Sequence, residues 1–224
     1  MNIIFDLDGT LTDPQDGICK SVAYALTQMA LPVPPASVLR TFIGPPLQDS
    51  FQAVIPGATP GDVQRDVQRA IAFYRERFAA IGLFENRVYA AIPPVLEALR
   101  DLDHQLWVAT SKPQVFAQQI LDHFELSPFF SAIHGSELDG TRSRKADLLA
   151  FVLQEQGLSA DHCWMVGDRH YDVTGALANH IPAVGVTWGY GTQEELETAG
   201  ARWVIDQPEE LLQVVDAQTA EAPL

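Results

Sequence analysis

Two aspartates separated by one residue follow an apolar run near the start of the chain. Asp6 and Asp8 follow a run that begins at Ile3, and Gly9 comes next. A carboxylate that leaves an apolar strand is costly unless it is paired or bound to a metal. Gly9 permits an immediate turn, and two such carboxylates can divide nucleophilic or metal-binding work from proton transfer. A capping aspartate followed by an Asp-Gly turn is the alternative interpretation of this segment alone.

Hydroxyl groups and a lysine accompany later apolar runs. Thr110 and Ser111 follow residues 105–109, and Lys145 is expected to start a helix. Hydroxyl, amide and ammonium groups are the donors that bind an anion such as phosphate. In an open parallel sheet ligands bind at the carboxyl ends of the strands, so we expect these groups to lie together at that end of the sheet.

A second pair of carboxylates follows the apolar run 163–166. Asp168 and Asp172 are four residues apart, so both could face one side of a helical first turn. Together with Asp6 and Asp8 they supply hard oxygen ligands of the kind that Mg²⁺ prefers. An aspartate at a helix start can also act as a cap and dipole partner, which is the alternative for Asp172. The strand-end residues predict a Mg²⁺ site beside a phosphate site.

Short apolar runs alternate with helical patterns along most of the chain. Such runs suit strands covered on both faces, and the alternation predicts an α/β fold with a doubly wound, Rossmann-like parallel sheet. The runs lie at residues 3–7, 105–109, 130–134, 163–166 and 183–187, with a marginal sixth at 201–205. A final helix is expected around residues 211–215.

The interval between the first two runs is far longer than a single crossover needs. Two helical stripes occupy it, one from Ile18 to Met29 and one from Val63 to Phe78, with prolines between them. We therefore expect a small inserted α-helical cap at residues 15–86 and a sheet core formed by residues 1–14 plus 87–224. In doubly wound sheets ligands bind outside the carboxyl ends of the strands, so the insert is expected over the site.

The segment 5–13, FDLDGTLTD, resembles the first signature of the haloacid dehalogenase-like superfamily of phosphohydrolases. Thr110, Lys145 and Gly167-Asp168 with Asp172 are similar to its second, third and fourth signatures, in that order. The resemblance implies that Asp6 is the nucleophile that forms an aspartyl-phosphate and that Asp8 is the general acid and base. Lys112 competes with Lys145 for the lysine role, but chain order favours Lys145, which leaves Lys112 to cap or to face solvent.

The resemblance also implies the ligands of the site. Asp6, the Asp8 carbonyl and Asp168 would hold Mg²⁺ with Asp172 near them, while Thr110 and Lys145 would bind phosphoryl oxygens. Gly9, Thr10 and Ser111 are expected to complete the phosphate site. His170 has two open interpretations, a substrate contact or a solvated loop residue.

Residues 41–47, TFIGPPL, resemble the phosphoglycolate phosphatase-like branch, and Gly140-Thr141-Arg142 resembles members described as 5'-nucleotidase-like. The resemblance implies a Mg²⁺-dependent phosphomonoesterase that hydrolyses phosphoglycolate or a nucleoside 5'-monophosphate. A phosphomutase or a dehalogenase of the same superfamily, or a non-catalytic phosphoacceptor or binding module, remains as an alternative. A receiver-type phosphoacceptor domain would be about half this length, and dehalogenation would need neither Asp8 nor a metal.

The composition limits the partners. Lys and Arg number 14 against 29 Asp and Glu, a net charge of −15 that repels nucleic acid and anionic membranes. The first dozen residues contain Asp6 and Asp8, where a signal peptide needs an uncharged stretch, and no run of 18 apolar residues occurs. We expect a cytoplasmic monomer or dimer whose partner is a small phosphorylated metabolite.

Overall fold

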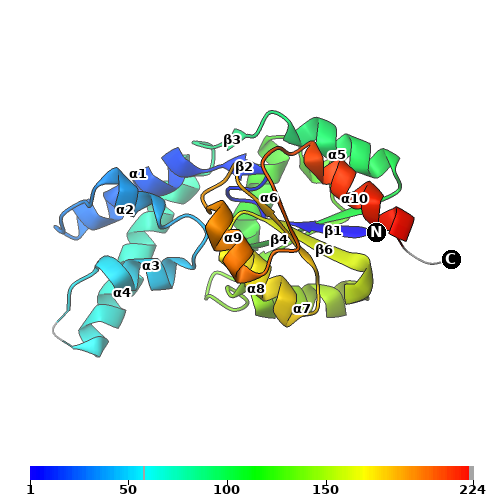
Figure 1. The fold of residues 1–224 in the computed structure, drawn as a ribbon. Helices are drawn as coiled ribbons and strands as arrows, with labels where there is room; N and C mark the ends of the chain where they lie inside the picture. The colour runs from blue at the N-terminus through cyan, green and yellow to red at the C-terminus, as the bar shows by residue number, and fades with distance from the viewer. Residues whose placement is uncertain (58, 222–224) are drawn as a thin grey trace. The chain divides into compact units, whose positions relative to one another are not determined.

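The computed structural model of the chain describes residues 1–57 and 59–221. A six-stranded, all-parallel sheet forms its centre, in the order β5-β4-β1-β6-β7-β8 (Figure 1). The strands are β1 (Asn2–Phe5), β4 (Gln105–Pro113), β5 (Ala132–Ser136), β6 (Cys163–Gly167), β7 (Ala183–Val186) and β8 (Trp203–Ile205). The predicted α/β fold with a parallel sheet and an added helical region is confirmed.

Helices cover both faces of this sheet. The helices are α5 (Ile92–Asp101), α6 (Gln114–His123), α7 (Lys145–Gln156), α8 (His170–Ala178), α9 (Gln193–Ala199) and α10 (Glu210–Glu221), with 3₁₀ turns at Ser127–Phe129 and Ala160–His162. In Figure 1, α5 and α10 lie on one side of the sheet, and α7, α8 and α9 lie on the other. Because all the strands are parallel, each strand begins at the same end of the sheet.

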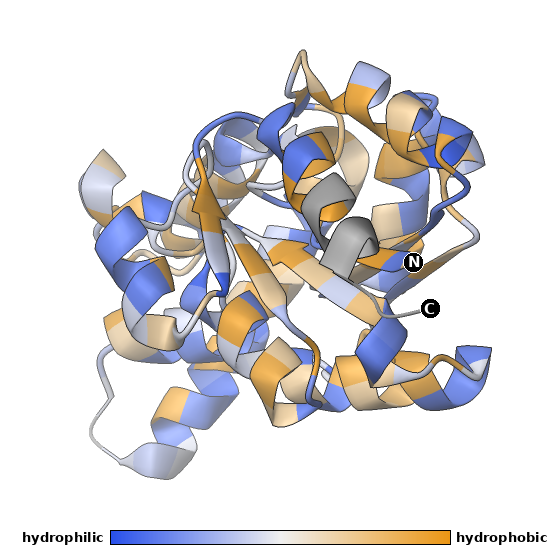
Figure 2. Ribbon diagram, turned by 45° about the vertical axis from the view of Figure 1, so that its right-hand side comes forward, coloured by the Kyte–Doolittle hydropathy of each residue, from blue (hydrophilic) through white to orange (hydrophobic). Residues whose placement is uncertain are grey.

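Apolar strand residues hold the layers together. Ile3, Ile4 and Phe5 in β1 are at most 1% exposed, and the strands of the sheet are largely orange in Figure 2. On the face of the sheet that α7 covers, Ile4 and Met165 pack in one cluster with Leu148. Burial on both faces explains why the strand sequences show no polar alternation.

All six strands differ from the predicted ranges, by one to four residues at one end or both. For three of them the local hydrogen bonds and turns give the reason. β1 ends at Phe5 instead of residue 7, because the Leu7 carbonyl accepts bonds from the amides of Leu11 and Thr12 and so belongs to a turn. β4 continues beyond residue 109 to Pro113, with a register shift between Thr110 and Pro113. β5 begins two residues late because a 3₁₀ turn occupies Ser127–Phe129.

Contacts divide the chain into two compact units, residues 1–13 with 88–221 and residues 14–87. The chain passes between them through β2 (Thr12–Asp13) and β3 (Arg87–Val88), which form a two-stranded sheet. That residues 15–86 form a domain of their own stays a prediction.

The unit of residues 14–87 is helical. It contains α1 (Gln15–Gln28), α2 (Ala36–Arg40), α3 (Leu47–Val54), α4 (Pro60–Arg77) and a π-helical turn at Phe78–Gly82. Its centre is aromatic: Phe51 packs edge-on against Phe42 and Tyr74, and Tyr74 stacks on Phe78. Both predicted stripes are helical, and they bury their apolar residues in this centre.

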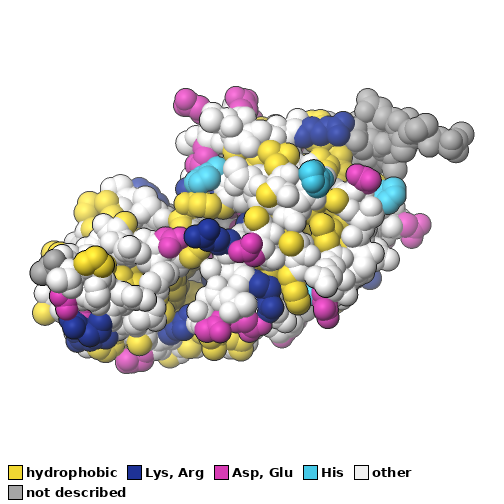
Figure 3. Space-filling view, turned by 90° about the horizontal axis from the view of Figure 1, so that it is seen from below, with side chains coloured by type: hydrophobic (Ala, Val, Ile, Leu, Met, Phe, Trp, Pro, Cys, Tyr) yellow, Lys and Arg dark blue, Asp and Glu magenta, His cyan; other side chains and the backbone are white. Residues whose placement is uncertain are grey.

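On the face drawn in Figure 3, acidic and basic side chains are interspersed with hydrophobic ones. None of the helices in residues 1–57 and 59–221 combines the length and apolar character needed to span a membrane.

Candidate active site

The parallel sheet brings distant segments to the carboxyl ends of its three central strands. Asp6 follows β1, Thr110 lies in the last part of β4, and Asp168 follows β6. Lys145 is the first residue of α7, as expected. β1 pairs with both β4 and β6, so residues far apart in the sequence become neighbours at one edge.

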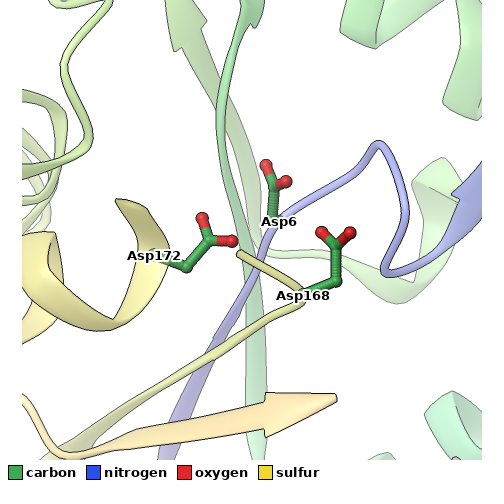
Figure 4. Close-up of side chains that lie close together, drawn as sticks. All are labelled: Asp6, Asp168 and Asp172. Carbon is green, nitrogen blue, oxygen red and sulfur yellow. The ribbon is translucent and has the colours of Figure 1, made fainter. Parts of the chain in front are cut away.

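Three buried carboxylates converge at this edge. Asp6, Asp168 and Asp172 each offer an oxygen that lies within 4.8 Å of the others (Figure 4). Asp168 is fully buried, and Asp6 and Asp172 are 6% and 2% exposed. Asp168 lies in the turn before α8 and Asp172 in its first turn, so the two do not share one helical turn as the spacing suggested.

Lys145 lies between two of these carboxylates. Its Nζ is 2.8 Å from Asp6 Oδ1 and 2.8 Å from Asp172 Oδ1, and it donates to the Ala109 carbonyl at 2.8 Å. Burial by itself lowers the pKa of Lys145, but the charges of Asp172 and Asp6 raise it above its ordinary value. The ammonium therefore stays charged and ties the nucleophile candidate to helix α8.

Burial raises the pKa values of both Asp168 and Asp172. Burial, together with the charges of Asp172 and Asp6, raises the pKa of Asp168 well above its ordinary value. Burial also raises the pKa of Asp172, against the opposing charge of Lys145. The Asp172 carboxylate accepts from the Arg169 amide at 3.1 Å, so the capping alternative describes part of its contacts.

A second buried ion pair holds Asp8. Lys112 Nζ lies 2.6 Å from Asp8 Oδ2, and Lys112 is 8% exposed. The expectation that Lys112 caps or faces solvent is therefore wrong, because the extended β4 directs its side chain inward. Burial raises the pKa of Asp8 despite the opposing charge of Lys112. Asp8 Oδ1 is buried and has no hydrogen-bond partner among the described residues.

The loop after β1 turns as Gly9 permits. Gly9 has φ +90°, and a Cβ there would lie 2.3 Å from Asp168 Oδ2, so a side chain would displace that carboxylate. The Gly9 amide donates to the Thr12 carbonyl at 2.7 Å. Thr10 is fully buried, and its hydroxyl donates to Asp168 Oδ1 at 3.4 Å.

The hydroxyls at the end of β4 have different surroundings. Thr110 is 2% exposed, and its Oγ1 accepts from the Lys112 amide at 3.3 Å, which leaves its own hydrogen to donate. Ser111 is half-buried, and its carbonyl accepts from Ser136 Oγ at 2.8 Å. Phosphate binding by Gly9, Thr10 and Ser111 stays a prediction.

The loop after β7 supplies contacts that the motifs did not indicate. The Tyr190 amide donates to Asp168 Oδ2 at 2.8 Å, and Trp188 Nε1 donates to the Thr10 carbonyl at 3.0 Å. The Tyr190 hydroxyl also donates to Asp13. A Cβ at Gly191 would lie 2.0 Å from the Asp168 carbonyl, so the loop needs glycine there. The Gly-Tyr-Gly sequence after an expected strand was the available signal.

The donor set fits a divalent cation. Three buried carboxylates converge, and one ammonium contacts two of them. When all three acids are ionised, the buried site therefore holds more negative than positive charge. Carboxylate oxygens are hard ligands, and a small hard cation such as Mg²⁺ would offset their repulsion. Asp6, Asp168 and Asp172 are the residues that would hold it.

Comparison with known proteins places these residues in a family. The family model described as haloacid dehalogenase-like hydrolase matches residues 3–186, most of the chain. A structure described as a predicted phosphatase from Clostridium acetobutylicum superposes with a TM-score of 0.89 at 44% identity, covering 96% of this chain and 97% of that one.

The curated relatives include proteins with different names. A 5'-nucleotidase of Pseudomonas aeruginosa is 48% identical over 87% of this chain and 86% of its own length. Tyrosine-protein kinase PtkA of Mycobacterium tuberculosis is 38% identical over 87% of this chain, which matches 65% of PtkA. A phosphoglycolate phosphatase of Caulobacter vibrioides is 31% identical over 91% of this chain and 85% of its own length.

The residues matched by the family model include both the first strand and the carboxylates after β6. The matches confirm the expected superfamily and the expectation of an enzyme. The chain belongs to the haloacid dehalogenase-like hydrolase family.

Proposed function

We propose that this protein is a Mg²⁺-dependent phosphomonoesterase that acts on a small phosphate ester, with nucleoside 5'-monophosphates as the first candidate substrates. The observation that carries the proposal is the buried group of Asp6, Asp168 and Asp172 with Lys145 bound between two of its members. The 5'-nucleotidase relative, at 48% identity, favours a nucleotide. Phosphoglycolate is the second candidate because a relative at 31% identity carries that name.

In the proposed reaction Asp6 attacks phosphorus, so an Asp6–phosphorus bond forms as the bond to the leaving oxygen breaks. Asp8 gives its proton to that oxygen, and the alcohol leaves. Asp8 then takes a proton from water, whose oxygen attacks phosphorus and releases phosphate and free Asp6. Burial raises the pKa of Asp8 against the opposing charge of Lys112, which makes the protonation needed for the first step less costly.

The other residues hold charge and position. Lys145, beside Asp6, offsets the repulsion between a carboxylate and a phosphate, and the Thr110 hydroxyl donates to a phosphoryl oxygen. Lys112 keeps Asp8 in place through their ion pair. Mg²⁺, when bound by Asp6, Asp168 and Asp172, supplies further neutralisation of the phosphoryl charge.

The test is a substrate panel with phosphate release as the readout. AMP, UMP, phosphoglycolate, a sugar phosphate and p-nitrophenyl phosphate are assayed with Mg²⁺ and with EDTA. We expect Mg²⁺-dependent phosphate release, with the highest kcat/KM for a nucleotide. Consumption of an ester without release of phosphate would instead indicate transfer, as in a mutase or kinase. Equal activity in EDTA would contradict the proposal.

A further inference from the structure

Glu195 of α9 holds two consecutive residues through one carboxylate oxygen. Its Oε1 accepts from Arg169 Nε at 3.0 Å and from the His170 amide at 3.0 Å. His170 Nδ1 lies 2.7 Å from the same atom and donates when it carries hydrogen. Neither interpretation of His170 from the sequence anticipated this pairing.

The two residues that Glu195 holds lie between Asp168 and Asp172. Arg169 follows Asp168 directly, and its amide donates to Asp172 Oδ2 at 3.1 Å. The backbone at residues 169 and 170 therefore fixes the direction in which both carboxylates leave the chain. A contact that anchors this backbone also determines how closely the two acids approach each other.

Glu195 is itself firmly placed. Its amide donates to Thr192 Oγ1, the N-cap of α9, at 3.1 Å, and the next residue, Leu196, is fully buried in the core. The Glu195 side chain is 24% exposed and borders a groove of about 460 Å³ lined also by His170, Thr174 and Thr198. Because the side chain borders solvent, we expect a substitution there to leave the core packing intact.

We propose that Glu195 is a positioning residue for the cation site: it clamps residues 169–170 so that Asp168 and Asp172 stay close enough to bind one divalent ion together. Asp168 and Asp172 repel each other when both are ionised, so how closely they approach depends also on the backbone between them. Loss of the clamp costs binding affinity because the cation must then draw the acids together itself. The inference rests on the proposed Mg²⁺ site and adds a residue outside the family signatures.

The test measures Mg²⁺ binding directly. Glu195→Ala and wild type are titrated with MgCl₂ by isothermal titration calorimetry, and kcat for p-nitrophenyl phosphate is measured at saturating Mg²⁺. We expect Glu195→Ala to raise the Kd for Mg²⁺ about tenfold, within the range seen for residues that support metal ligands. At saturating Mg²⁺, kcat should stay within about threefold of wild type, because the proposed reacting groups are unchanged.

Glu194→Ala is the matched control. Glu194 is exposed on the same helix turn and carries the same charge, so this variant separates the clamp from a general loss of negative field. We expect its Kd to lie within about twofold of wild type. Glu195→Gln keeps an acceptor oxygen and removes the charge. If Glu195→Ala does not fold, Glu195→Gln takes its place, and we expect it to raise the Kd for Mg²⁺ at least about threefold.

Three possible results would exclude the clamp, and they differ in what they imply for the proposed metal site. An unchanged Kd in folded Glu195→Ala, beside wild type that binds Mg²⁺, removes the clamp and leaves the proposed function standing. An equal loss in Glu194→Ala also removes the clamp, since charge alone would explain it. Absence of Mg²⁺ binding by wild type overturns the proposed metal site and the clamp with it.

Discussion

Asp6 and Asp8 are two residues apart, yet each is held by a different lysine. Asp6 contacts Lys145 on α7, and Asp8 contacts Lys112 at the end of β4. The first lysine also binds Asp172, so it links the acids of the cation site. The second contacts Asp8 through Oδ2, while Asp8 Oδ1 is buried without a hydrogen-bond partner in the part of the chain that the structure describes. Two chemically identical side chains thereby gain separate environments, as nucleophile and proton-transfer roles require.

Asp6→Asn should remove phosphatase activity almost completely. The amide cannot attack phosphorus, and the cation loses an anionic ligand. We expect kcat for p-nitrophenyl phosphate to fall more than about a thousandfold, a rise in the barrier of about 4 kcal/mol. Asp161→Asn, at an exposed position, is the control and should leave kcat unchanged. Activity of Asp6→Asn within tenfold of wild type would exclude Asp6 as the nucleophile.

Lys112→Met should destabilise the fold strongly. The change leaves the Asp8 carboxylate buried without its partner, and breaking a buried pair typically costs about 3–5 kcal/mol. Lys20→Met breaks exposed pairs with Asp16 and Glu85, which water screens, and should cost much less than Lys112→Met. Urea unfolding followed by circular dichroism gives both values. Equal losses in the two variants would show that the Lys112 pair is screened by water.

The sequence predicted the acids of the site better than their supports. Asp6, Asp168 and Lys145 stand at strand ends or helix starts, where apolar runs break, so their approximate place followed from the pattern. The pairing of Lys112 with Asp8 depends on β4 continuing through an irregular register to Pro113, which no periodicity indicated. Glu195 and the Tyr190 amide lie in helix α9 and the loop before it, and only the fold brings them to Arg169 and Asp168.

At the scale of elements, the existence of the strands was more predictable than their ends. β1, β4 and β6 are buried on both faces, and continuous apolar runs record that burial in the sequence. β5 was misplaced by two residues because the Ser127-Pro128 turn competes with strand formation at its start. The insertion was visible because a parallel pair needs a crossover of only a dozen or more residues.

Helix α9 should depend on its N-cap. Thr192 accepts a hydrogen bond from the Glu195 amide, and replacing such a cap with alanine typically costs about 1 kcal/mol. We expect Thr192→Ala to lower the free energy of unfolding by about that amount and Thr192→Ser to retain it. Thr198→Ala, at an exposed position later in the same helix, should have a much smaller effect. Indistinguishable urea midpoints for Thr192→Ala and wild type would show that the cap adds no net stability.

At the scale of the whole molecule, the cation site should connect folding to metal binding. Binding of Mg²⁺ to the folded state stabilises it by about 2.7 kcal/mol at a hundredfold excess over Kd. We expect a rise in Tm with MgCl₂ and its reversal by EDTA. Asp168→Asn removes an acid whose pKa burial raises, so it should stabilise the metal-free protein and abolish the Mg²⁺-dependent rise. A full Tm rise in Asp168→Asn would exclude Asp168 as a ligand.

The position of β1 at the centre of the sheet has a consequence for biosynthesis. It pairs with β4, which begins at Gln105, and with β6, which begins at Cys163. During synthesis it therefore lacks the first neighbour for about a hundred residues and the second for about a hundred and sixty. The helical residues 14–87 pack mainly with one another and are complete long before then. Such non-local pairing is slow and leaves apolar strand edges exposed to aggregation. We therefore expect β1, the strand that leads into Asp6, to stay exposed during synthesis until β6, the sixth strand in chain order, has been made.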